Sequence, residues 1–175
     1  SVLVSQVLLY PGLEETVVAL GGGDDILAGT WFLVAEFGAF VVCAVLWGVV
    51  SDATSTRTPL VVLGAAGGAF SYLAVAVSPE LGLGFGAVLV LRVVGGAFTI
   101  GAFSLSITML MDLSGGHGRN MGAAGTAIGL GAALGAVVGG RLATVDPLAP
   151  LYAGATILAG AGLLAATVPD RSPGE

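Results

Sequence analysis

The chain has 175 residues, of which 56% are hydrophobic and 9% charged, and its mean hydropathy is +1.03. Soluble domains carry about 25% charged residues, so this composition indicates a membrane protein. The formal net charge of −6, with five arginines and no lysine, argues against nucleic-acid binding. The single cysteine, Cys43, and the single histidine, His117, are too few for a zinc site or an internal disulfide, and we expect no metal or cofactor.

Apolar segments follow one another along almost the whole chain. A helix needs about 20 apolar residues to cross the ~30 Å hydrocarbon core of a bilayer. Only Glu36 and Arg92 interrupt the five long segments. We therefore predict an all-α membrane protein, with a six-helix transmembrane bundle over 1–168 and a cytoplasmic tail or the start of a linker over 169–175. The predicted spans are 2–20, 28–50, 59–78, 81–111, 121–140 and 148–168.

Short polar segments separate the predicted spans, and their arginines indicate the orientation. The longest is 112–120, which contains His117, and we expect that histidine to be solvated in a loop. Cytoplasmic loops are enriched in Arg and Lys. With the N-terminus inside, three of the arginines outside the spans fall inside and one falls outside, so we predict a multi-pass plasma-membrane protein with cytoplasmic termini. The inner arginines are Arg57, Arg119 and Arg171, and the outer one is Arg141.

Glu36 and Arg92 are the charged residues inside the long spans. An ionisable side chain at mid-membrane depth costs about 2.5–3.5 kcal/mol on insertion scales, so it is usually paired or functional. Glu36 lies eight residues after Ala28 and Arg92 eight residues after Gly84, which places both about 12 Å deep on the same side of the membrane. We predict that they face the bundle interior and pair. The pair is either purely structural or part of a substrate or proton pathway.

The first predicted span carries three polar residues at four-residue spacing, Gln6, Tyr10 and Glu14. In a continuous helix they share one face. The alternative is that Pro11 and Gly12 end the helix, in which case Glu14 lies in water.

The fifth predicted span carries a glycine pattern. Gly131, Gly135 and Gly139 recur every four residues and form one smooth stripe, which lets a partner helix approach closely. Gly122 precedes this stripe and Gly140 follows it directly. Such a stripe is also common in ordinary membrane packing.

The full glycine spacing resembles the antiporter motif Gly-x8-Gly-x3-Gly-Pro-x2-Gly-Gly of the major facilitator superfamily, with Ala136 in place of the proline. The segment 48–57 resembles that family's loop signature through Gly48, Asp52 and Arg57. Residues Ala53, Ser55 and Thr56 depart from that signature. The segment that starts at Arg92 resembles the family's Arg-x-x-Gln-Gly sequence, with Gly95 in place of glutamine.

The three motifs occur in the family's order and on the expected helices. The chain therefore resembles the N-terminal six-helix half of a major facilitator transporter of the drug/proton antiporter kind, built from two three-helix repeats. The resemblance implies that the first and fourth helices line a cavity, which makes the Gln6 face a candidate substrate contact with Thr99 and Ser106 as possible partners. It also implies a role for Arg92 in proton coupling.

The resemblance further implies a cytoplasmic gate around the loop after the second helix. We expect Gly48, Asp52 and Arg57 to form it, together with Arg119 or a helix terminus. The plain alternative is a solvated loop pair that contributes about 0–1 kcal/mol.

These features predict a secondary transporter that moves a small organic solute by alternating access, by proton-coupled export. The chain has no phosphate-binding loop and no assembled catalytic set, so an ATPase or another enzyme is not expected. Its expected partners are the lipid bilayer, a small-molecule substrate and a second six-helix half, in the same full-length chain or in a partner chain. The alternative from another class is a membrane scaffold or assembly subunit that docks through the glycine stripe.

Overall fold

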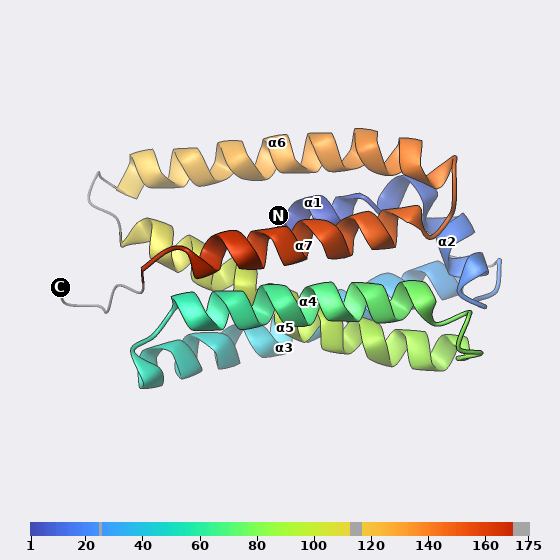
Figure 1. The fold of residues 1–175 in the computed structure, drawn as a ribbon, viewed down its shortest axis with the longest axis horizontal. Helices are drawn as coiled ribbons and strands as arrows, with labels where there is room; N and C mark the ends of the chain where they lie inside the picture. The colour runs from blue at the N-terminus through green and yellow to red at the C-terminus, as the bar shows by residue number, and fades with distance from the viewer. Residues whose placement is uncertain (25, 113–116, 170–175) are drawn as a thin grey trace.

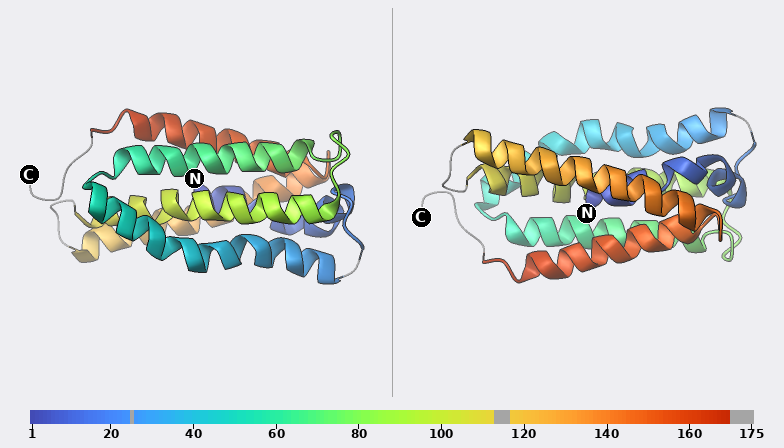
Figure 2. Two further views of the ribbon diagram at one scale, coloured as in Figure 1. Left: turned by 90° about the horizontal axis from the view of Figure 1, so that it is seen from below. Right: turned by 90° about the horizontal axis from the view of Figure 1, so that it is seen from above.

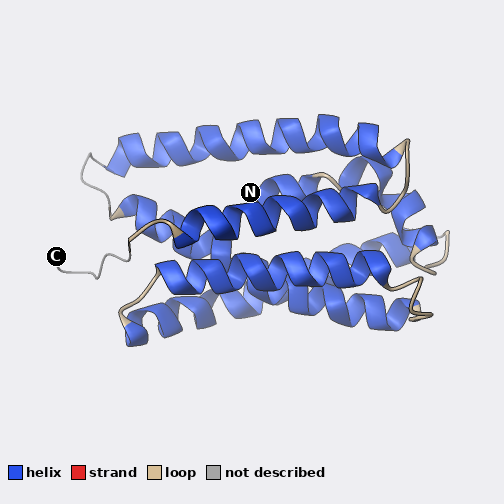
Figure 3. Cartoon of the chain, viewed as in Figure 1, coloured by secondary structure: helices blue, strands red, loops and turns tan. Residues whose placement is uncertain are grey.

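The computed structural model describes residues 1–24, 26–112 and 117–169, except for the side chain of His117. All regular elements in this part of the chain are helices, as Figure 3 shows. Six helical segments are long and apolar enough to span a membrane, which confirms the predicted all-α bundle. The elements are α1 (Val2–Val7), η1 (Tyr10–Gly12), α2 (Leu13–Ala19), α3 (Ile26–Thr54), α4 (Thr58–Val77), α5 (Phe85–Met111), α6 (His117–Ala143) and α7 (Ala149–Ala166).

The first span, Val2–Ala19, is interrupted by a short 3-10 turn. Pro11 lies in that turn and has no N–H to donate to the preceding helical turn, so α1 ends at Val7 and α2 starts at Leu13. The α2 segment is tied to the loop between α6 and α7, because the Thr16 hydroxyl donates to the Pro147 carbonyl at 2.7 Å.

Helix α5 is central to the bundle and packs along both α3 and α4, while α4 also packs along α7 (Figures 1 and 2). On the other side, α6 packs on α1 and η1. Small residues let α4 approach α5 closely. A Cβ on Gly64 would lie 2.6 Å from the Ala102 nitrogen, and the Ser71 hydroxyl donates to the Leu91 carbonyl at 2.6 Å. Such close contacts are typical of membrane helices that pack through Gly, Ala and Ser.

Helix α3 is held on α5 at two levels. Gly96 of α5 lies directly against the backbone carbonyl of Glu36, where a Cβ would not fit. Further along, the Trp47 indole N–H donates to the Ala97 carbonyl at 2.6 Å and its ring lies over Gly101. The sequence of α5 thus provides the space into which α3 packs.

The predicted glycine stripe of α6 packs against the first span of the same chain. A Cβ on Gly135 would lie 3.0 Å from the Val4 carbonyl oxygen, and one on Gly139 would clash with the Leu8 carbonyl oxygen. Gly131 and Gly140 also lie next to this span, whereas a Cβ on Gly122 would meet no atom within 4 Å.

Two predicted helix starts differ from the structure. The fourth span starts at Phe85 rather than at residue 81, because the chain turns at Gly82, which has a positive φ of 66°. Helix α6 starts at His117 rather than at residue 121, so the loop predicted over 112–120 is shorter and Arg119 belongs to the first turn of the helix. Residues 113–116 of that loop, and 170–175 of the predicted tail with Arg171, lie outside the described residues.

Candidate functional site

Glu36 of α3 and Arg92 of α5 form an ion pair inside the bundle. Nη2 of Arg92 donates to Oε2 of Glu36, and the two side chains are 2% and 1% exposed. The predicted inward orientation and pairing of these residues are therefore present in the structure. Removal of one partner from such a pair leaves an uncompensated buried charge, which costs about 3–5 kcal/mol.

Two aromatic rings surround the Arg92 guanidinium. Its central carbon lies 4.3 Å from the centroid of the Phe32 ring and 5.3 Å from that of Tyr72. Both distances are within the ~6 Å range of cation–π attraction. The Tyr72 hydroxyl also lies 3.4 Å from Oε1 of Glu36, to which it donates. Residues from α3, α4 and α5 thus form one buried group, which we call the charge cluster: Phe32, Glu36, Tyr72 and Arg92.

Gln6 of α1 lies beside the Glu36 carboxylate and is itself buried. Its side-chain amide acts as a hydrogen-bond donor to that carboxylate, so α1 adds a polar contact to the charge cluster.

The other polar residues of the first span do not join the charge cluster. The break at Pro11 interrupts the face predicted for Gln6, Tyr10 and Glu14, as the alternative interpretation anticipated. Tyr10 is 43% exposed, although it lies within electrostatic range of Glu36 and Arg92, and Glu14 is exposed on α2. The predicted pathway role of these residues stays a prediction.

At the end of the bundle where α3 meets α4, Arg57 forms an ion pair with Asp112, the residue that follows α5. The sequence had instead suggested Arg57, Asp52 and Arg119 as a group. Asp52 and Arg119 are exposed, and Gly48 is half-buried. The Asn120 side chain donates to the Leu110 carbonyl at 3.0 Å and so fixes the start of α6 to the end of α5.

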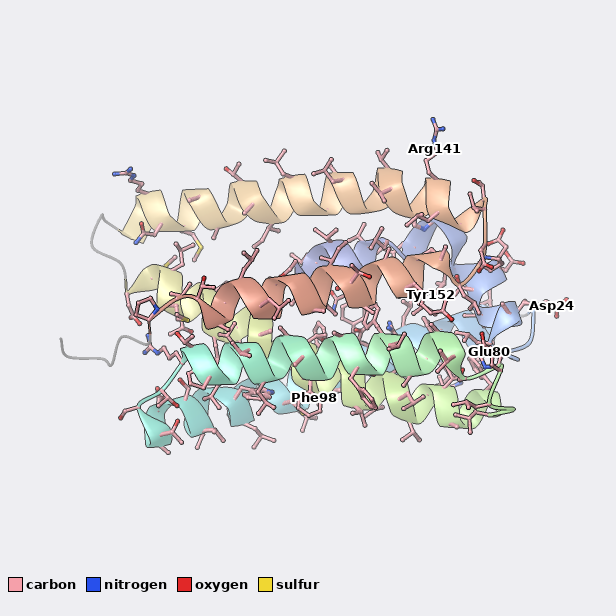
Figure 4. The ribbon with its side chains drawn as sticks, viewed as in Figure 1. Asp24, Glu80, Phe98, Arg141 and Tyr152 are labelled. Atoms are coloured by element: carbon pink, nitrogen blue, oxygen red, sulfur yellow. The ribbon has the colours of Figure 1, made fainter. Side chains whose placement is uncertain are left out.

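The opposite end of the bundle carries Asp24, Glu80 and Arg141, as Figure 4 shows. Arg141 points away from the bundle. The arginines predicted to be on different sides of the membrane, Arg57 and Arg141, therefore lie at opposite ends of the bundle.

A cavity of about 180 Å³ lies between α1, α5 and α6, and its lining is largely apolar. Ser106 lines it, whereas Thr99 is fully buried and donates to the Gly95 carbonyl at 2.9 Å. None of the lining residues belongs to the charge cluster. The cluster is therefore closed off from this cavity in the observed conformation.

Sequence reasoning missed three residues that contact the charged groups: Phe32, Tyr72 and Asp112. Phe32 precedes Glu36 by four residues, so helical spacing alone places it on the same face. Tyr72 is a hydroxyl-bearing residue in an otherwise apolar span, which is a weaker signal. Nothing in the local sequence of Asp112 indicates that Arg57 would be its partner.

The chain has six membrane-length helical segments, and a buried ion pair joins the second span, α3, to the fourth, α5. This arrangement can be compared with known proteins. The family described as Major Facilitator Superfamily matches residues 6–175. The chain belongs to this superfamily. Searches among curated proteins and among solved structures gave no significant match.

Membership of the major facilitator superfamily accounts for the bundle as one transporter half. In this frame the first span, α3 and α4 form one three-helix unit, and α5, α6 and α7 form the other. Glu36 belongs to the first unit and Arg92 to the second. The family consists of transporters, which agrees with the expectation that the chain is not an enzyme.

Proposed function

We propose that the chain is one half of a secondary active transporter that exports small organic solutes in exchange for protons. The observation that carries this proposal is the buried Glu36–Arg92 pair, because it joins the two three-helix units of a major facilitator half. Alternating access requires the contact between the two three-helix units to rearrange. A group at this contact whose charge can change therefore affects that rearrangement.

The chemistry of the exchange follows from the charge of Glu36. While Glu36 is ionised, its attraction to Arg92 holds α3 against α5 in a low-dielectric interior. A proton on Glu36 removes most of that attraction, so the contact between the units weakens. A solute gradient and a proton gradient can then be coupled through the same pair of helices.

The positions of the arginines support a plasma-membrane orientation with the termini in the cytoplasm. Arg57 and Arg119 then lie inside, and Arg141 lies outside. In this orientation Glu36 and Arg92 occupy the outer halves of α3 and α5. A proton that arrives from outside has the shorter path to Glu36, in agreement with export driven by proton entry.

The exposed surfaces of α3 and α6 support a second six-helix half as the partner of this bundle. Only 11% of the residues in the most apolar stretch of α3, and the same share in α6, are buried, against 33–50% in the other spans. We infer that the second half packs on these two helices, and that it is a further part of a longer chain or a separate chain. The alternative scaffold function has less support, because the glycine stripe on which it relied is already packed against α1.

The test is proton movement in vesicles. Vesicles that contain the protein with its second half are loaded with the pH-sensitive dye pyranine, and a panel of small organic solutes is added under an imposed pH gradient. We expect proton entry that depends on the solute and is lost in Glu36→Gln. Arg92→Lys should reduce it strongly, because lysine keeps the charge but loses the planar fork of arginine.

The matched control is Glu80→Gln, which neutralises an exposed carboxylate at the proposed outer end and should transport normally. Full solute-dependent proton movement in Glu36→Gln would contradict the proposed coupling.

A further inference from the structure

We propose that Phe32 and Tyr72 are positioning residues that hold the Arg92 guanidinium in place while Glu36 exchanges its proton. This inference rests on the proposed proton coupling and assigns the change of charge to the carboxylate alone. The observation behind it is the contact of one buried guanidinium with two aromatic rings, at 4.3 Å and 5.3 Å from their centroids.

A proton on Glu36 leaves Arg92 as a buried cation without an anionic partner. The titratable groups around Glu36 are Arg92 from α5, Tyr72 from α4 and, at longer range, Tyr10 from η1. In the described part of the chain, α7 contains no charged residue, and α6 carries its arginines only at its ends. Glu14 and Glu15 of α2, which packs against α3, are exposed, so no second carboxylate among the described residues is at hand to replace Glu36. The aromatic faces are what remains to stabilise the cation, and cation–π attraction is strongest where water is excluded.

Both rings are fixed in place by their surroundings. Phe32 and Tyr72 are 0% and 1% exposed. Gly154 of α7 lies behind the Tyr72 ring, where a Cβ would approach it to 2.7 Å. The rings therefore cannot move away from the guanidinium when the carboxylate changes charge.

The two rings act differently on Glu36, and this difference makes the inference testable. Phe32 faces the guanidinium and has no donor to offer the carboxylate, so it favours the state in which Arg92 has lost its anion, which is the protonated state of Glu36. The Tyr72 hydroxyl donates to the carboxylate, so it favours the ionised state of Glu36. Loss of the Phe32 ring should make Glu36 harder to protonate, and loss of the Tyr72 hydroxyl should make it easier.

The experiment follows the carboxyl group directly. Infrared difference spectra of the protein in liposomes are recorded across a pH series, and the band of the protonated Glu36 carboxyl is identified by its absence in Glu36→Gln. We expect the pH of half-protonation to fall by about one unit in Phe32→Leu. In Tyr72→Phe, which keeps the ring, we expect it to rise. Phe32→Met gives a second variant that fills the space without an aromatic face.

The matched control is Phe37→Leu, which changes a phenylalanine on the same helix that pairs with Phe40 and not with Arg92. Opposite shifts in the two test variants, with the control unshifted, support the inference, and any other pattern overturns it. The infrared titration needs no transport. Opposite shifts without solute-dependent proton movement would therefore overturn the proposed function while the placement of the cation by the two rings stands.

Discussion

Arg92 places a positive charge in an interior that excludes both water and lipid headgroups. Its side chain is 2% exposed, so its stability depends on what the neighbouring helices supply. Glu36 supplies the opposite charge, and Phe32 and Tyr72 supply polarisable faces. The pair therefore links the stability of the bundle to the protonation state of one carboxylate.

The first prediction concerns the unequal effects of removing each charge. Arg92→Ala leaves the Glu36 carboxylate buried without a cation, and we expect it to lower the free energy of unfolding by about 3–5 kcal/mol. Glu36→Gln should cost less, because its amide oxygen can still accept from Arg92 and the two rings still contact the guanidinium. The measurement is unfolding in mixed detergent micelles with increasing SDS.

A double-mutant cycle gives the control for this prediction. The double variant Glu36→Gln/Arg92→Ala removes both charges, so it should be more stable than Arg92→Ala alone. A double variant whose loss equals the sum of the single losses would show that the two side chains do not interact.

The charged residues of the site, and the face that Phe32 shares with Glu36, could be predicted from the sequence, but the approach of Tyr72 could not. The depth of Glu36 and Arg92 in their helices follows from the 1.5 Å rise per residue, so their approach could be anticipated. Tyr72 lies in an apolar span on another helix, and its hydroxyl is only a weak signal in a chain of this composition. Only the packing of both α3 and α4 against α5 brings the Tyr72 ring to the ion pair.

At the scale of the helices, glycine sets how closely the partners of α5 approach. Gly96 lies directly against the Glu36 carbonyl, so a methyl group there pushes α3 away from α5. The second prediction is that Gly96→Ala lowers the free energy of unfolding by about 1–3 kcal/mol and also weakens the Glu36–Arg92 pair. The measurement is again unfolding in SDS-containing micelles, now combined with the infrared titration of Glu36.

Gly86→Ala is the matched control for Gly96→Ala, because Gly86 lies on the same helix and a Cβ there meets no atom within 4 Å. It should be neutral or slightly stabilising, since alanine favours the helix over glycine by about 1 kcal/mol. Equal stability of the two variants would mean that the close approach of α3 and α5 is not required.

The third prediction concerns the contact between α6 and the first span. A Cβ on Gly139 would clash with the Leu8 carbonyl oxygen, just before the break at Pro11. We expect Gly139→Ala to separate α6 from α1 and to speed proteolysis in the loop that follows Ala143. Gly129→Ala, on the same helix with open space around it, should be cleaved at the wild-type rate. Equal cleavage of both variants would argue against this packing role of the stripe.

The six spans could be predicted because the bilayer core offers no water to backbone N–H and C=O groups. A helix pairs these groups with one another by hydrogen bonds within the same segment. The glycine stripe predicted a close helix contact but did not identify its partner, since spacing on one helix carries no information about the others. The start of α6 at His117 was also missed, because the glycines at 115, 116 and 118 indicate a turn when they are read without their tertiary context.

At the scale of the whole molecule, the charges divide between the two ends of the bundle. Arg57 and Asp112 lie at the end where α3 meets α4, and Asp24 and Glu80 lie at the other. This division, together with the buried pair in the first halves of α3 and α5, gives the half bundle a polarity along the membrane normal. This polarity is the basis of the proposed direction of proton entry.

The fourth prediction tests that orientation by the labelling of introduced cysteines. Cys43→Ala removes the native thiol, and single cysteines are then placed at two exposed positions, as Asp52→Cys and Val145→Cys. In intact cells, a membrane-impermeant maleimide should label Val145→Cys but not Asp52→Cys, because the proposed orientation puts the end with Arg57 and Arg119 in the cytoplasm. Permeabilised cells provide the control, in which both positions should react. Labelling of Asp52→Cys from outside would reverse the orientation, and the proton path would then have to reach Glu36 from the cytoplasmic side.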